Sequence, residues 1–329
     1  MTGIFRANNP LNTFLLFVYG ILLKFVWLFH PQAPVVQKSD GFFFKDILTA
    51  IKPFFDAHPT GYFIITYLLL FTQAISFNQV IINRRLMQKP NYLPAMSYLL
   101  ITSFFNEWNV LSAPLIINTI LIWVWSKMSS LNNNQHPKST LFNAGIAIGV
   151  AAFFYLPAFA FAIFIILSII ITRPLKIAEW IIAFIGILTP WYFLACWLFF
   201  TDKLYSFRLS GFGFSVPSYE SYASLSVELI GISLIFLMII AGAFYVRTFM
   251  IKQILQVRKS WALMLLYLVV AIGIPFISMN HNMEYWLLAL IPAAAFMGCA
   301  FYYPRVKWIP MVLQWIFVGF VLYLQYFQK

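Results

Sequence analysis

The chain has 329 residues, of which 62% are hydrophobic, 20% aromatic and 9% charged, and its formal net charge is +12. Soluble domains carry about 25% charged residues, so this composition excludes an ordinary soluble protein. It predicts an all-α integral membrane protein with one multi-pass domain over residues 1–329. Basic residues that flank membrane helices explain the positive charge, so we expect no nucleic-acid partner.

The first apolar run covers residues 11–29, after Arg6 and before His30–Pro31. No small-residue cleavage site follows the run, so we expect a retained first membrane helix. Lys24 lies inside it. An ionisable side chain at that depth is either a functional residue or a side chain whose long stem extends to the membrane surface.

Residues 42–57 place polar side chains at steps of three and four, the pattern of an amphipathic helix. A short helix with one charged face is expected to lie in the membrane interface instead of crossing. Ser39 or Asp40 stands where the N-cap of this helix is expected. We interpret Asp46 and Asp56 as charges on its solvated face.

Two longer stretches, 91–126 and 141–171, are ambiguous between one crossing and two. A single helix over 91–126 would be about 54 Å long, too long for one crossing. We predict two short helices that meet at the sequence FNEWN, which contains Glu107. In the second stretch, Pro157 favours a break at Tyr155–Leu156, because the residue before a proline is disfavoured in a helix.

The remaining predicted spans bring the total to about eleven crossings: 60–80, 178–200, 225–246, 260–279, 284–301 and 308–327. With a cytoplasmic N-terminus, this topology keeps most basic residues in the cytoplasm and puts the C-terminus in the periplasm of a bacterial inner membrane. Reading only 141–171 as one crossing would expel Arg247, Lys252, Arg258 and Lys259 together. Reading both ambiguous stretches as single crossings restores the parity and stays an alternative.

The predicted layout resembles the GT-C superfamily of integral-membrane glycosyltransferases. The sequence HPQAPVVQKSDGFFFKDI occupies the position of the acidic first outer loop, before the interfacial helix. MEYWLLALIPAAAFMG (Met283–Gly298) is similar to a late segment of these enzymes. The resemblance covers residues 10–200 as a GT-C-like core and 280–300 locally, with an outer loop at 201–224 and C-terminal helices over 225–329. The chain also resembles a family of Bacteroidota inner-membrane proteins, which implies no function.

The GT-C resemblance implies a transferase whose donor is a polyprenyl-phosphate sugar at the outer face. Asp40 would then be the base that takes a proton from the acceptor hydroxyl. Arg208, His281 and Lys203 would stabilise the phosphate, with Arg208 favoured because guanidinium binds phosphate bidentately. The implied substrate-binding residues also include Glu284 and Glu107. The sequence has no metal-ligand spacing and no cofactor motif.

Each candidate residue also has a structural interpretation. Lys203 is then a side chain at a helix end, Arg208 a solvated loop charge and His281 a turn residue. Glu107 becomes an interface residue, and Glu284 begins a helix, where a carboxylate meets the positive end of the dipole.

Two other functions are compatible with the sequence. The protein is alternatively a non-catalytic membrane subunit or scaffold that binds lipids or a membrane protein partner. It is alternatively a transporter or flippase, although the chain contains no recognisable inverted repeat.

Overall fold

The computed structural model describes residues 2–56, 58–133, 136–174, 176–205, 222–251, 253–278, 282–306 and 308–327. This part of the chain is helical, and its one β-type pairing is an isolated bridge between Asp40 and Tyr155. The α-helices are α1 (Thr2–Phe5), α2 (Leu11–Leu23), α3 (Phe25–Phe29), α4 (Phe42–Phe55), α5 (Thr60–Asn83), α6 (Leu93–Ile101), α7 (Ala113–Ser129), α8 (Pro137–Phe154), α9 (Phe161–Thr172), α10 (Ile177–Phe200), α11 (Tyr222–Met250), α12 (Leu255–Gly273), α13 (Leu287–Tyr302) and α14 (Trp308–Phe327). The 3₁₀ turns are η1 (Asn106–Asn109), η2 (Leu131–Asn133), η3 (Leu156–Ala160), η4 (Ile274–Ile277) and η5 (Met283–Trp286).

Six helices within the described ranges are long and apolar enough to cross a membrane. An all-helical membrane protein is therefore confirmed. The number of eleven crossings is not established by helix length, because the other helices of the bundle are shorter or less apolar. The six spans are Thr60–Asn83, Ile177–Phe200, Leu229–Met250, Leu255–Ile277, Met283–Tyr302 and Trp308–Tyr326.

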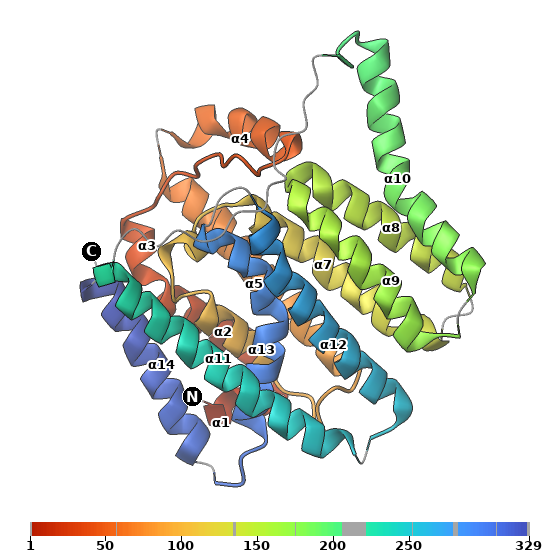
Figure 1. Ribbon diagram of the computed structural model, residues 1–329. Coiled ribbons are helices and arrows are strands. Elements are labelled where there is room, and N and C mark those ends of the chain that lie inside the picture. The colour runs from red at the N-terminus through yellow and green to blue at the C-terminus, as the bar shows by residue number, and fades with distance from the viewer. Residues whose placement is uncertain are drawn as a thin grey trace.

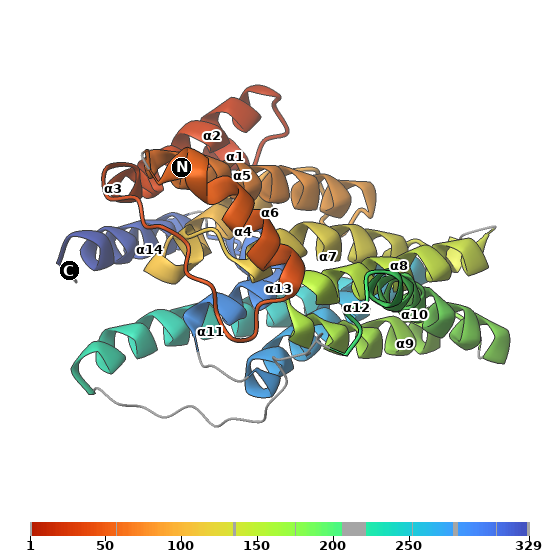
Figure 2. The ribbon, with the colours of Figure 1, turned by 90° about the horizontal axis from the view of Figure 1, so that it is seen from above.

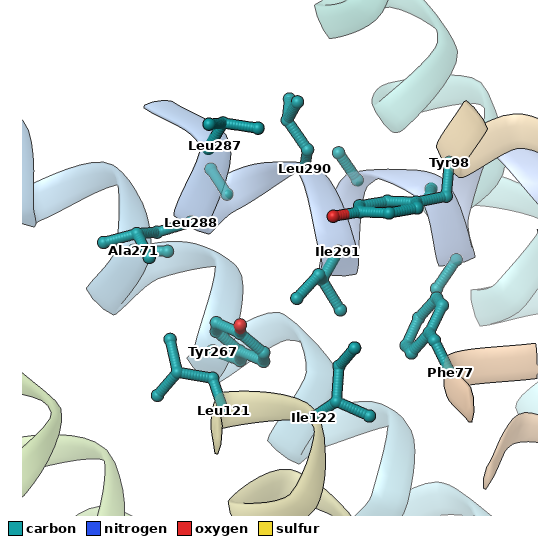
Figure 3. Packing of buried hydrophobic residues seen from close by; sticks show 14 of the residues in the cluster. Phe77, Tyr98, Leu121, Ile122, Tyr267, Ala271, Leu287, Leu288, Leu290 and Ile291 are labelled. Carbon is teal, nitrogen blue, oxygen red and sulfur yellow. The ribbon is translucent and has the colours of Figure 1, made fainter. Parts of the chain in front are cut away.

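Helix α13 is the centre of the bundle (Figure 1). Each of its residues from Leu287 to Tyr302 is buried. Figure 3 shows its leucines and Ile291 packed among Tyr98 of α6, Tyr267 of α12 and aliphatic side chains of α7. A membrane helix with apolar residues all round can face either lipid or protein, so the sequence pattern did not distinguish this central position.

The stretch 91–126 forms the predicted pair of short helices. Before α6, the Asn78 amide donates to the Asn91 carbonyl over 3.0 Å. Further along, the Tyr98 hydroxyl donates to Gln73 over 2.7 Å, and the Gln73 amide donates to the Leu115 carbonyl over 2.6 Å. Helix α6 therefore runs back along α5 towards its middle, where the chain turns through η1 and returns in α7.

The stretch 141–171 forms a second hairpin, and the predicted break is confirmed. Helix α8 ends at Phe154, Tyr155 has extended backbone angles, and η3 begins at Leu156. Helix α9 then returns, and the Arg173 guanidinium after it donates to the carbonyl of Leu131, which precedes α8, over 3.1 Å.

The prediction of one continuous helix over 11–29 is wrong at Lys24, where α2 ends and α3 begins. The Lys24 side chain is fully buried. Its ammonium donates to the Thr102 carbonyl (3.0 Å), the Thr102 hydroxyl (3.2 Å) and the Asn109 side-chain oxygen. An ammonium has three N–H donors, so these neutral acceptors satisfy all of them without a carboxylate.

Helix α4 lies across one end of the bundle, as expected for an interfacial helix (Figures 1 and 2). We name this end the α4 end. Phe44 and Leu48 are buried against the bundle, whereas Phe54 is exposed. The predicted N-cap is wrong: Gly41 occupies the N-cap position, and no side chain caps the helix.

At the opposite end, which we name the basic end, cationic side chains terminate helices. The Arg84 guanidinium donates to the Ser126 carbonyl over 2.8 Å, and the Lys259 ammonium donates to the Thr172 carbonyl over 2.8 Å. Cations at helix C-termini satisfy carbonyls that have no partner within the helix and interact favourably with the helix dipole. Part of the basic excess therefore has a structural role.

Candidate functional site

Several breaks in the helical chain meet at the α4 end. Residues 39–41 pair with the end of α8, η3 contacts η4, η4 contacts η5, and η5 contacts η1. The Trp108 indole in η1 donates to the Met283 carbonyl in η5 over 2.6 Å. Non-helical backbone inside a membrane protein is tolerated where it is buried in protein or lines a cavity, so this meeting point is the candidate site.

Asp40 is held at this meeting point by both backbone and side chain. Its Oδ2 accepts a hydrogen bond from the Gln37 backbone N–H over 2.7 Å. The next residue, Gly41, donates its N–H to the Phe154 carbonyl over 2.7 Å. Asp40 is only 3% exposed, so it is a buried carboxyl in a loop and not a helix cap.

Four hydroxyl groups surround Asp40. The Ser39 and Ser278 hydroxyls share a hydrogen bond of 2.7 Å. The rings of Tyr155 and Tyr285 stack with their centroids 5.0 Å apart and an interplanar angle of 18°. Both phenol oxygens are buried beside these serines: the Tyr155 hydroxyl interacts with Ser278, and the Tyr285 hydroxyl with Ser39 and Ser278. Each hydroxyl can rotate to donate or accept a further hydrogen bond, so a cluster of four of them is suited to a polar ligand.

A second carboxylate belongs to the same group. Glu284 in η5 is half-buried, and its Oε1 accepts a hydrogen bond of 3.3 Å from the Asn282 amide. The charges of Asp40 and of exposed Glu107 both act on Glu284. We name this group the Asp40 cluster: Ser39, Asp40, Tyr155, Ser278, Glu284 and Tyr285.

The environment of Asp40 changes its acidity. Burial raises the pKa of Asp40 from an ordinary value of 3.8 to about 6, while the Gln37 N–H and the Lys45 charge act in the opposite direction. Burial dominates because it removes the water that stabilises the carboxylate. A carboxyl that ionises close to neutral pH is suited to accept a proton in a reaction.

The raised pKa predicts a pH-dependent stability. Between about pH 4 and 6 the folded protein keeps a proton on Asp40 that the unfolded chain releases, so stability falls as pH rises through this window. The substitution Asp40→Asn removes this loss of stability and keeps a side-chain oxygen that can accept the Gln37 N–H. We expect the variant to gain up to about 3 kcal/mol over the wild type at pH 7 and nothing at pH 4. Thermal melts of both proteins across this range measure it, and parallel curves would contradict it.

Gly41 allows the close approach between the Asp40 loop and α8. A methyl group at this position would overlap the Phe153 carbonyl oxygen. The backbone angles of Gly41 suit any residue, so the clash alone makes the position specific for glycine. We expect Gly41→Ala to lower the free energy of unfolding by about 1–3 kcal/mol. Gly319→Ala, which meets open space, is the control, and an equal loss in both variants would contradict the contact.

An apolar cavity of about 120 Å³ is lined in part by η5, the turn that also carries Glu284 and Tyr285. Trp108, Met283 and Trp286 line its upper part, and α11, α12 and α13 form its walls as far as Ala293. Phe236 of α11 lines the cavity and is 61% exposed, so the cavity opens at the apolar surface of the bundle. The η5 turn is therefore common to both: it contributes Glu284 and Tyr285 to the Asp40 cluster, and Met283 and Trp286 to the border of the apolar cavity.

The structure unites part of the predicted site. It brings Asp40 and Glu284 together and places Glu107 near them. Lys203 follows the end of α10 that projects from the bundle, where its side chain is exposed, so it does not join the Asp40 cluster (Figure 1). Arg208 and His281 lie outside the described residues. Within the described ranges no group of His, Cys, Asp and Glu side chains is placed to hold a metal ion.

The comparison with protein families places the chain. The sequence model of DUF6427, a family of unknown function, matches residues 47–329 of the chain. The chain belongs to this family. Neither a curated protein nor a solved structure matches the sequence. The DUF6427 match includes Tyr155, Glu284 and Tyr285 and begins after Asp40, inside α4.

Sequence reasoning missed several members of the site. Lys45 follows the polar periodicity of residues 42–57, which indicates a solvated side chain, yet its charge acts on buried Asp40. Tyr155 was recognised as a break before Pro157 but not as a site residue, and Ser278 gave no local signal. Tyr285 lies in the quoted MEYW sequence, next to Glu284, and was the one member with a motif to identify it.

Proposed function

We propose that this DUF6427 protein transfers a sugar from a polyprenyl-phosphate donor at the outer face of a bacterial inner membrane, with Asp40 as the general base. The observation that carries the proposal is the border between the Asp40 cluster and the apolar cavity. A lipid-linked sugar has this same division, with a polar head and an apolar chain. The GT-C resemblance adds support, because it puts an acidic residue in the loop where Asp40 lies.

The proposed reaction is a displacement at the anomeric carbon. Asp40 takes the proton of an acceptor hydroxyl as that oxygen bonds to the anomeric carbon. The bond between the anomeric carbon and the phosphate oxygen breaks, and polyprenyl phosphate leaves with the electron pair. Glu284 and Glu107 would accept hydrogen bonds from sugar hydroxyls. Among the described cations, Lys45 is the one whose charge acts on Asp40. Arg208 and His281 stay candidates for binding the phosphate.

The topology that accompanies this proposal has eleven crossings and a GT-C-like core. The pair α2–α3 would form the first crossing, and α5 to α14 would form the other ten. The α4 end would then be outer, the basic end cytoplasmic, and the C-terminus periplasmic. The positive-inside rule supports this orientation, because it puts the basic end, with Arg84 and Lys259, in the cytoplasm.

Cysteine labelling tests the orientation. Single cysteines at Arg84, Lys138 and Arg258 should react only after the membrane is permeabilised. Cysteines at Lys45, Arg208 and Lys329 should react in intact cells. Cys196 is partly exposed and is first replaced by serine. Labelling of position 138 from outside would contradict the two-hairpin topology.

A non-catalytic membrane subunit is the second candidate. The observation that favours it is the closure of the site, since Asp40 is almost fully buried and the hydrogen bonds at Gln37 and Ser278 hold its loop. In this alternative the Asp40 cluster would stabilise a scaffold for lipids or a partner protein.

A transfer assay separates the two candidates. Purified protein is added to proteoliposomes that contain polyprenyl phosphate carrying radiolabelled glucose or mannose, together with membranes of a strain that lacks the gene. Transfer predicts that label moves from the lipid to a lipid-insoluble acceptor only when the wild-type protein is present. If the label stays on the lipid with both sugars, while the protein still restores the growth of the strain that lacks the gene, the non-catalytic subunit is favoured.

A further inference from the structure

The loop between α5 and α6 forms a pocket at the basic end, away from the Asp40 cluster. The pocket has a volume of about 460 Å³. Its apolar wall comprises Ile81, Ile82 and Met87, and its polar rim includes Arg85 and Lys89. A basic rim above an apolar wall is the chemistry of a lipid headgroup site at a membrane surface.

The backbone of this loop is fixed by its neighbours. The Trp261 indole of α12 donates to the Leu86 carbonyl over 3.1 Å. The buried Asn91 amide donates to the Lys89 carbonyl over 2.8 Å, and the Asn78 amide holds the Asn91 carbonyl in turn. The loop therefore presents its basic side chains from set positions.

Two basic side chains of this loop have no protein acceptor. Arg84 is already bonded to the Ser126 carbonyl. Arg85 and Lys89 are exposed, and across the described residues no acceptor contacts their charged groups. Arg85 also has a φ of 51°, a left-handed conformation that is disfavoured for residues other than glycine. The conformation ends α5 in a Schellman motif, in which the Leu86 N–H donates to the Ile81 carbonyl and the Arg85 N–H donates to the Ile82 carbonyl.

The charge balance of this end also favours an anion. Glu179 is the acidic side chain described there, and it pairs with Arg173 over 3.4 Å. Arg85 and Lys89 therefore meet no competing carboxylate in the described structure. A guanidinium binds phosphate bidentately, and an ammonium adds a point charge.

We propose that Arg85 and Lys89 bind the phosphate of an anionic phospholipid in the leaflet at the basic end. The acyl chains would lie along the half-buried Ile82 at the end of α5. This site is independent of the proposed sugar transfer, because it lies at the other end of the bundle and uses none of the same residues.

Lipid-dependent melting tests the site. Wild-type protein in mixed micelles is melted with phosphatidylglycerol, with phosphatidylcholine, or with inorganic phosphate alone. We expect phosphatidylglycerol to raise the melting temperature by several degrees over phosphatidylcholine. Arg85→Gln/Lys89→Gln should lose at least two thirds of that rise and keep the wild-type melting temperature in phosphatidylcholine, because both side chains are exposed.

A matched control removes the same charge from the same end. Lys138→Gln/Arg258→Gln should keep the full response, and Arg85→Lys/Lys89→Arg should keep most of it. An equal loss in the control would show a diffuse charge effect and overturn the site. A rise with inorganic phosphate equal to the rise with phosphatidylglycerol would overturn the assignment to a lipid.

Discussion

Asp40→Asn is expected to lower the rate of sugar transfer by about 10²–10⁴-fold without unfolding the protein. Asparagine keeps the size of the side chain and an oxygen that can accept the Gln37 N–H, so the loop geometry is retained. It has no basicity near neutral pH. The measurement is turnover in the proteoliposome assay together with growth of the complemented null strain.

The control for this variant lies on α4, the helix that follows Asp40. Asp46→Asn removes an exposed carboxylate from α4 and should retain wild-type turnover. Asp40→Asn with full complementation and normal turnover would remove Asp40 from catalysis and favour the subunit interpretation. Because the cap position belongs to Gly41, a loss of activity in Asp40→Asn cannot be assigned to a lost helix cap.

Asn109→Leu is expected to lower the free energy of unfolding by about 3 kcal/mol. The substitution removes a side-chain acceptor of the fully buried Lys24 ammonium, which then lacks a partner for one N–H. Hydrogen bonds to a charged group contribute about 1.5–3 kcal/mol, and a buried charge left without its partner costs more. The Asn109 amide also loses its bond to the Phe105 carbonyl. Denaturant titration of the purified protein measures the change.

Two variants identify the cause of that loss. Asn109→Asp restores an acceptor for Lys24 and should be at least as stable as the wild type at neutral pH. Asn118→Leu removes a buried amide whose partners, the Leu287 carbonyl and the Tyr98 hydroxyl, are neutral, so it should cost about 1 kcal/mol. Equal losses in Asn109→Leu and Asn118→Leu would show that the charge of Lys24 is not the reason.

The sequence predicted those parts of the fold that depend on local chemistry. The break before Pro157 follows from the restriction that proline puts on its neighbour, and it is observed at Tyr155. The amphipathic pattern of residues 42–57 predicted α4. The break at FNEWN followed from polar residues in the middle of a run too long for one helix, and η1 occupies it.

The predictions that were wrong concern features that depend on contacts between distant segments. The break at Lys24 is satisfied by Thr102 and Asn109, which no local pattern connects to the first helix. The Asp40 carboxylate accepts the N–H of the preceding Gln37 because the loop is fixed against α8, so its expected capping role was wrong. The stacked pair Tyr155 and Tyr285 is likewise a product of the tertiary fold.

A photoreactive polyprenyl-phosphate probe tests most directly whether the Asp40 cluster and the apolar cavity bind one lipid-linked substrate. The probe carries its reactive group near the head of the chain, and cross-linked peptides are mapped after irradiation in proteoliposomes. We expect cross-links around Trp286 and Leu290 of the η5–α13 segment and Ile235 of α11, and we expect them to decrease when unlabelled polyprenyl-phosphate sugar is added. Cross-links spread over the exposed faces of α10 and α14, and unchanged by the competitor, would contradict it.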